Sequence, residues 1–241
     1  MKGFELLKET FLRKSYLPVI HLIVFAIYLL LYVPANLPVE WGRLLFVCSG
    51  LLLPLVLTQG IFGDDIASGR IRVLVTKPLQ TGELYLWRLL GVSVQWIGHA
   101  LCGATIILVL HAVTNKGKLD NFALWCLCSG ILYATFASLS MTVSICVTGG
   151  RNFMVLVFGI VLLGTISVLA GPHPTYASDS LVAIIKHVFP PVQLLFQLAN
   201  SKTPLPGHIA VRVLHGGILI GAYTLIGTVL LHTREFAHRE S

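Results

Sequence analysis

The residues best placed to do chemistry gather in one polar segment, residues 62–91. Asp64 and Asp65 open it, as is typical of a helix N-terminus, where backbone N–H groups and the macrodipole favour negative charge. Pro78 ends whatever helix precedes it. We expect a short amphipathic helix between these points, although residues 70–73 also alternate like a strand. Its membrane-facing residues would be Ile66, Ile71 and Leu74. Its solvent-facing residues would be Arg70, Arg72 and Lys77.

Three motifs typical of ATP-binding and hydrolytic enzymes are absent. Gly117-Lys118 is followed by Leu119 rather than by Ser or Thr, and no P-loop for ATP occurs elsewhere. Neither G-x-S-x-G nor H-E-x-x-H is present. All ten acidic residues lie outside the apolar stretches given below, which argues against an ion-driven carrier and a membrane-embedded enzyme. A surface site around Asp64 and Asp65 remains the alternative for an enzyme.

Histidine and cysteine offer a different chemistry, a haem or metal centre. Four histidines lie within or near apolar stretches: His21, His99, His111 and His215. Paired histidines can hold a haem, but no two are expected at the same depth, and we expect His99 to line a helix contact. The five cysteines predict buried apolar thiols, without a disulfide or a metal site. They are Cys48, Cys102, Cys126, Cys128 and Cys146.

The composition is that of a membrane protein. Of 241 residues, 56% are hydrophobic and 11% charged, with a mean hydropathy of +0.84, whereas soluble domains carry about 25% charged residues. This excludes an ordinary cytosolic enzyme, a disordered tail and a nucleic-acid binder. We interpret the net charge of +7 as the basic excess that fixes the orientation of membrane spans.

Six charge-free apolar stretches are long enough to cross about 30 Å of hydrocarbon. They are residues 17–34, 44–62, 89–112, 122–147, 153–171 and 213–231. No remaining piece suits a separate soluble domain, so we expect residues 1–241 to form one all-α membrane domain. With both termini in the cytoplasm, most Lys and Arg residues lie inside. A signal peptide cleaved near residues 33–35 is the competing interpretation, but the first apolar run is long for one.

Three further elements accompany these spans. Residues 1–16 predict an amphipathic interface helix with Phe4, Leu7 and Phe11 on its apolar side, the alternative being a solvated basic leader. Residues 63–88 form a cytoplasmic loop. Residues 172–212 predict two short extracytoplasmic helices separated by a double proline, either dipping into the membrane or lying on its surface. A stripe of small residues in the fourth span predicts a helix-packing face: Gly130, Ala134, Ser138 and Thr142.

The segment after the second span resembles that of the permease subunits of ABC-2-type ABC transporters. Their pattern is an acidic residue, a glycine four positions on, an aliphatic residue, and a Leu-Leu-x-x-Pro-aliphatic run. The matching residues here are Asp65, Gly69, Ile71, Leu74, Val75, Pro78 and Leu79, with Arg88 where a basic residue opens the third span. Three positions depart from the family pattern: Asp65 replaces the commoner Glu, Arg70 replaces Thr or Ser, and Thr81 replaces a frequent Arg.

The resemblance implies that residues 64–77 form a coupling helix that docks on a separate ATPase subunit. The chain would then be a non-catalytic permease of the bacterial inner membrane, paired with a second permease copy or homologue and two ATPase subunits. ATP and magnesium would bind to those partners, and this chain would hold no cofactor. The family usually exports, and the lack of charge in the spans favours an amphipathic or lipid-like cargo. The alternative is a membrane anchor or haem-carrying redox subunit, which a haem absorption band would identify.

Overall fold

The computed structural model describes residues 2–13, 19, 23, 26–27, 49–70, 80–114, 122–147, 150–169, 190, 195 and 206–237 of the chain. Among these residues every regular element is a helix. Three helices are long and apolar enough to cross a membrane: α6 (Thr81–Thr114), α7 (Phe122–Cys146) and α11 (Pro206–Ala237). The expected all-α class is confirmed at this level, with three candidate spans.

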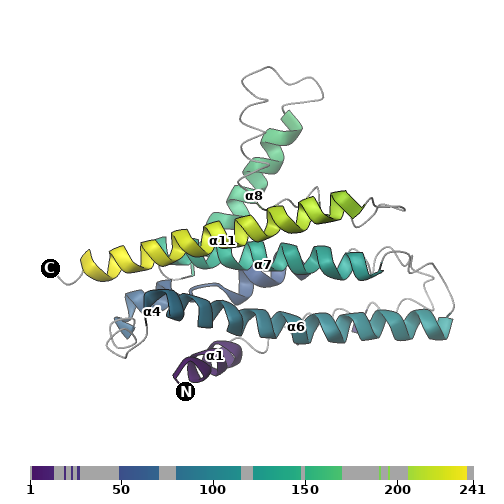
Figure 1. The fold of residues 1–241 in the computed structure, drawn as a ribbon, viewed down its shortest axis with the longest axis horizontal. Helices are drawn as coiled ribbons and strands as arrows, with labels where there is room; N and C mark the ends of the chain where they lie inside the picture. Colours follow the sequence, from purple (N-terminus) through teal and green to yellow (C-terminus); the bar gives the residue numbers. More distant parts are fainter. Residues whose placement is uncertain are drawn as a thin grey trace.

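These three helices lie side by side and define the long axis of the molecule (Figure 1). α7 and α11 run in the same direction and α6 in the opposite one (Figure 1). At 1.5 Å per residue, the 34 residues of α6 extend over about 50 Å, so the helix is longer than the hydrocarbon core is thick.

α7 is the central helix. Several of its large side chains, including Trp125, Leu132 and Phe136, are fully buried. α11 approaches α7 closely through two glycines: a Cβ on Gly216 would collide with Ile131, and one on Gly227 would lie 2.8 Å from the Thr142 hydroxyl. Close backbone approach through glycine is the usual way in which helices pack inside a membrane.

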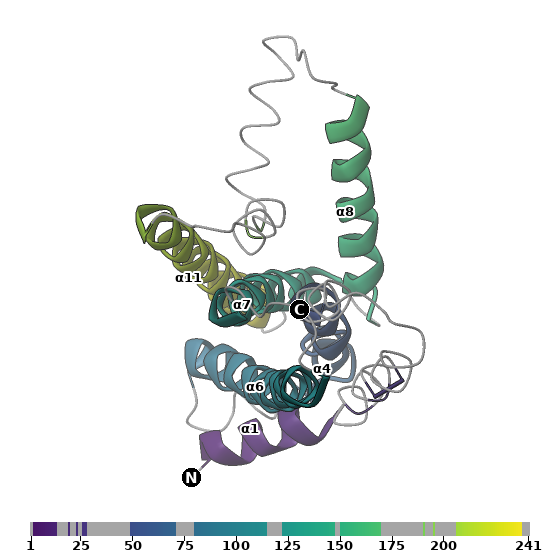
Figure 2. The same ribbon diagram turned by 90° about the vertical axis from the view of Figure 1, so that its right-hand side faces the viewer.

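α1 (Lys2–Arg13) crosses α6 obliquely near the end where α6 begins (Figures 1 and 2). Glycines again permit the contact, because a Cβ on Gly91 of α6 would lie 2.8 Å from the Cβ of Thr10. The side-chain amide of Gln95 donates a hydrogen bond to the carbonyl of Phe11. The helix predicted within residues 1–16 is therefore present as α1, and it packs on α6. Its location at a membrane interface remains a prediction.

Several predicted boundaries differ from the structure. The third span was expected to start at residue 89, but α6 starts at Thr81, where the Glu83 carboxylate accepts a hydrogen bond from the Gln80 N–H (3.4 Å) and caps the helix. Residues 81–88, expected in the cytoplasmic loop, thus belong to α6. Likewise residues 206–212, expected in the extracytoplasmic insertion, belong to α11, because Pro206 suits the first turn of a helix.

The other predicted spans are described in part. Residues 17–34 and 172–205 lie almost entirely outside the described residues. Residues 49–57 of the second predicted span are helical and are followed by turns and by the short α4 (Gly63–Ala67). α8 (Asn152–Leu169) occupies most of the fifth, but it projects away from the three long helices in both views (Figures 1 and 2). The six-span arrangement thus remains a prediction.

Candidate functional site

Two acidic and two basic side chains form a closed ring of alternating charge where α1, α4 and α6 meet. Arg88 Nη2 lies 2.7 Å from Asp65 Oδ2, and Arg88 Nη1 lies 3.4 Å from Glu9 Oε1. Arg70 Nη2 lies 2.7 Å from Glu9 Oε2, and Arg70 Nη1 lies 3.9 Å from Asp65 Oδ1. We call these four residues the charge ring. The ring joins three segments that are far apart in the sequence.

The charge ring has a buried side and an exposed side. The side chains of Arg88 and Asp65 are 0% and 4% exposed, whereas those of Arg70 and Glu9 are 47% and 35% exposed. Arg88 also donates a hydrogen bond to the Thr10 hydroxyl at 3.1 Å. A buried charge is tolerated when it is paired and hydrogen-bonded, so Arg88 of α6 depends on its partners in α1 and α4.

Asp65 is held in place by contacts from α7 to the start of α4. The Ser144 hydroxyl oxygen accepts hydrogen bonds from the N–H groups of Phe62 and Gly63, each at 3.1 Å. These N–H groups belong to the first turn of the helix, where no carbonyl within the helix is available. α4 has no side-chain cap of its own, so α7 supplies it.

A second polar cluster fixes the turn before α4. The amide of Asn152, at the start of α8, donates to the Ser140 hydroxyl (3.0 Å) and accepts from the N–H of Gly60 (3.1 Å). The Thr58 hydroxyl lies 2.6 Å from the Ser140 hydroxyl. Gly60 has a φ of +68°, a conformation that glycine adopts without strain. The turn therefore has a defined position relative to α7 and α8.

The small-residue stripe of α7 faces helices of the same chain. Gly130 packs against Trp96 of α6, and a Cβ at this position would lie 3.1 Å from the ring. The Tyr85 hydroxyl donates to the Ser138 carbonyl at 2.8 Å, and the Thr142 hydroxyl donates to the Tyr223 carbonyl of α11 at 2.8 Å. Residues of the stripe thus contact both α6 and α11.

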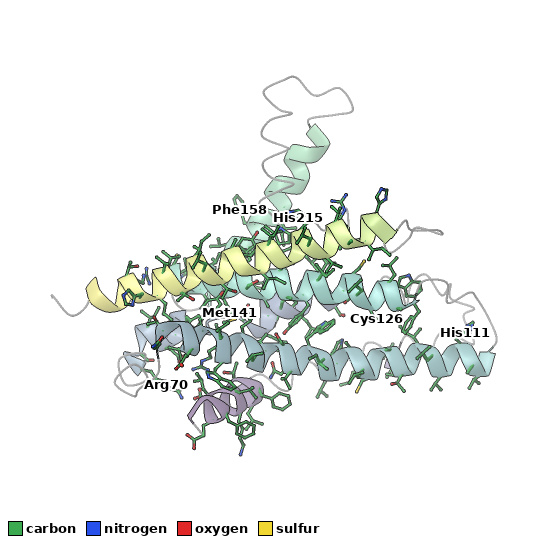
Figure 3. The ribbon with its side chains drawn as sticks, in the orientation of Figure 1. Arg70, His111, Cys126, Met141, Phe158 and His215 are labelled. Carbon is green, nitrogen blue, oxygen red and sulfur yellow. The ribbon has the colours of Figure 1, made fainter. Side chains whose placement is uncertain are left out.

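The structure places the predicted coupling residues on two sides. Asp65 is buried and Asp64 half-buried, whereas Arg70 is exposed at the end of the molecule near α4 (Figure 3). Gly69 has a φ of +68° and open space around it. The remaining predicted coupling residues lie outside the described residues: Ile71, Arg72, Leu74, Lys77 and Pro78. Of the helix expected over residues 64–77, the structure describes α4 and the helical residue Arg70.

Sequence reasoning missed four contributors to this site: Glu9, Thr10, Ser144 and Asn152. Glu9 is one of the ten acidic residues outside the apolar stretches, and nothing in the sequence connects it to residues 65–88. The serine and asparagine lie at the ends of predicted spans, where buried polar side chains are commonly satisfied by a neighbouring helix. Such partners become visible only in three dimensions.

The histidines expected near the spans are dispersed. His99 is 2% exposed on α6, while His111 lies at the far end of α6 from the charge ring and His215 lies on α11 (Figure 3). Over the described ranges, no group of three or more His, Cys, Asp or Glu side chains is arranged to hold a metal ion. In the charge ring each carboxylate lies against two arginines, so the ring joins three segments of the chain.

The geometry defines a helical protein with candidate membrane spans and a charge ring at one end of the bundle. Comparison with protein-family models gives no match, and no curated protein matches the chain.

Proposed function

We propose that this chain is the permease subunit of an ABC-2-type ABC transporter, working with a second permease and two separate ATPase subunits. The observation that supports this most is the charge ring. It connects the segment expected to meet an ATPase, residues 63–70, to the start of a long apolar helix. A force applied to this segment would therefore reach α6 through short ion pairs.

The proposal assigns different roles to the two sides of the segment. Ala67, Ser68 and Arg70 are exposed and would meet the ATPase. Asp65 is buried against Arg88 and would hold the segment on α6. Gly69, with open space around its Cα, would let the ATPase surface come close to the backbone.

The directions of the long helices agree with the proposed topology. Six spans that start and end in the cytoplasm give the fourth and sixth spans one direction and the third span the other. α7, α11 and α6 run in this way (Figure 1). In this topology the charge ring, the C-terminal end of α7 and the C-terminal end of α11 lie on the cytoplasmic side of a bacterial inner membrane.

The mechanism needs two conformations of the transporter, and ATP binding to the ATPase subunits would favour one of them over the other. Closure of the ATPases would move residues 63–70, and the charge ring would carry this motion to α1 and α6 together. The chain contributes no catalytic residue in this scheme, and the cargo would be amphipathic or lipid-like and exported.

Copurification tests the proposal. A tagged chain is purified in mild detergent from its native host, and the copurifying polypeptides are identified by mass spectrometry. We expect a stoichiometric P-loop ATPase in the wild-type preparation and its loss from Ala67→Trp, which adds bulk at an exposed position of α4. Thr233→Trp, at an exposed position near the C-terminal end of α11, is the matched control and should retain it.

Two results would contradict the proposal. One is a pure preparation without any ATPase. The other is equal recovery of the ATPase with Ala67→Trp and with the control. A coloured preparation with a haem absorption band and no ATPase would instead identify the redox-subunit alternative.

A further inference from the structure

α8 is attached to the rest of the described chain by its first turns. Asn152, its first residue, is fully buried, and Leu156 belongs to a buried apolar cluster with Leu55 and Phe136. Farther along, Phe158 is 69% exposed, and the helix projects away from α6, α7 and α11 (Figures 1 and 2). A helix held at one end changes its direction when that end moves, so the contacts of Asn152 bear on where α8 points.

The Asn152 amide joins α8 to two other segments of the chain. Its Oδ1 accepts a hydrogen bond from the Gly60 N–H at 3.1 Å, in the turn before α4. Its Nδ2 donates to the Ser140 hydroxyl of α7 at 3.0 Å and to the Thr58 carbonyl at 3.3 Å. The side chains of Thr58, Ser140 and Asn152 are all buried, and a buried polar group that loses its partner costs about 1 to 3 kcal/mol. The amide therefore holds the turn before α4 against the start of α8.

The turn before α4 is itself fixed to α4. The Gly60 carbonyl accepts a hydrogen bond from the Asp64 N–H at 3.0 Å, and a Cβ on Gly60 would collide with the Asp64 carboxylate. The next residue, Asp65, is paired with Arg88 of α6 at 2.7 Å. One short segment, residues 60–65, thus contacts α8 at its first residue and α6 at its last.

The turns that precede α4 and α8 also touch each other. Gly60 and Gly150 have φ values of +68° and +70°, which glycine adopts without strain. A Cβ on Gly150 would lie 3.0 Å from the Gln59 side chain. This contact adds to the hydrogen bond between Asn152 and Gly60, and it leaves little room for one turn to move without the other.

We propose that α8 moves together with residues 58–65, and that Asn152 is the positioning residue that links them. The 18 residues of α8 extend over about 27 Å, so a tilt of about 15° at Asn152 would displace the far end by about 7 Å. The linkage is a property of the chain alone. Its use in transport rests on the proposed function: an ATPase docked at residues 67–70 would move α6 and α8 at once, through opposite ends of one segment.

Hydrogen–deuterium exchange of the full chain in nanodiscs tests the linkage without an ATPase. Ser144→Ala removes the hydroxyl that holds the start of α4 on α7. We expect it to raise the exchange rate of residues 62–66 by about tenfold, the effect of one lost hydrogen bond, and that of residues 155–160 by at least about threefold. With Asn152→Ala already present, Ser144→Ala should raise only the exchange rate of residues 62–66.

The matched control is Thr135→Val, which removes a buried hydroxyl that donates within α7, to the carbonyls of Ile131 and Leu132. It should leave both segments unchanged. Residues 216–226 of α11 report global unfolding and should exchange equally in all variants. An unchanged exchange rate of residues 155–160 in Ser144→Ala, or an equal rise there with and without Asn152→Ala, would overturn the proposal.

Distances between spin labels test the use of the linkage in the ATPase complex. The labels are attached to Phe158→Cys on α8 and Ile218→Cys on α11, two exposed positions, in a chain whose native cysteines are replaced by serine. ATP with vanadate should shift this distance by about 2 Å, the effect of a tilt of about 15° over the six residues from Asn152. Asn152→Ala should abolish the shift. A label pair at Val94→Cys on α6 and Ile218→Cys should respond to ATP in both chains.

The outcomes separate this inference from the proposed function. If no ATPase copurifies with the chain, the proposed function fails, and the exchange experiment still decides whether the linkage exists. If the ATPase copurifies and ATP shifts only the label pair on α6 and α11, transmission to α8 is refuted. An equal shift at position 158 with and without Asn152→Ala would refute the role of Asn152.

Discussion

Arg88 of α6 and Asp65 of α4 form an ion pair with 2.7 Å between Nη2 and Oδ2, and both side chains are buried. The attraction between such groups is strong because little water screens them, but each has lost its own hydration. The pair is therefore less a source of net stability than a constraint. Neither residue can leave this position without exposing the other to an apolar surrounding.

Removing one member of this pair should be costly. We expect Asp65→Asn to lower the free energy of unfolding by about 3 to 5 kcal/mol, because the buried Arg88 charge loses its nearest partner. Thermal or denaturant unfolding in detergent measures the change. Glu5→Gln removes the same charge at an exposed position and should change stability by less than about 0.5 kcal/mol.

The double variant Asp65→Leu with Arg88→Met separates the constraint from simple loss of contact. Replacing both charges by apolar side chains is often neutral, so the double variant should be more stable than Asp65→Asn. If Asp65→Asn proves as stable as the Glu5→Gln control, the ion pair does not have the importance described here.

The two arginines of the charge ring should differ sharply in their effect on stability. Arg70 is half-exposed, so Arg70→Gln should lower the free energy of unfolding by less than about 1 kcal/mol. Arg88 is fully buried, so Arg88→Gln should lower it by about 3 kcal/mol or more. Similar losses for both variants in the same unfolding assay would mean that the exposed side of the ring is screened less than its exposure suggests.

α6 illustrates what the sequence could and could not predict. The absence of charge located α7 almost to the residue, because residues 122–147 contain no Lys, Arg, Asp or Glu. The same criterion started the third span at residue 89, since Arg88 was taken as its boundary. The structure continues the helix back to Thr81, and Arg88 lies within it, neutralised by Asp65 and Glu9. That neutralisation joins three segments, and no local pattern reports it.

The interface helix shows a related limit. Its amphipathic pattern was evident from Phe4, Leu7 and Phe11, yet the side that packs on α6 is Gly3, Leu6 and Thr10. Two small residues make close packing possible on that side, whereas the large aromatic residues remain exposed. Hydrophobic periodicity identifies the helix, but the partner's shape selects the buried side.

The capping of α4 by α7 predicts a cost at a single serine. Ser144→Ala removes the acceptor of two N–H groups, those of Phe62 and Gly63, and each unsatisfied buried donor costs about 1 to 3 kcal/mol. We expect a loss of at least about 2 kcal/mol in the free energy of unfolding. The control is Ser93→Ala, whose hydroxyl donates to its own helix at Leu89. A loss no larger than that of the control would show that water replaces Ser144.

The two kinds of glycine on α11 should respond oppositely to the same substitution. A Cβ on Gly227 would lie 2.5 Å from the Tyr85 ring and 2.8 Å from the Thr142 hydroxyl, so Gly227→Ala must push apart α6, α7 and α11. We expect it to lower the free energy of unfolding by about 1 to 3 kcal/mol, as overpacking usually does. Gly217 has open space around it, and Gly217→Ala should be neutral or stabilising by up to about 1 kcal/mol, because alanine favours the helix. Both variants change one hydrogen to a methyl group on the same helix, so unfolding in the same detergent compares packing alone. Equal effects at the two positions would show that α11 does not approach α6 and α7 as closely as described.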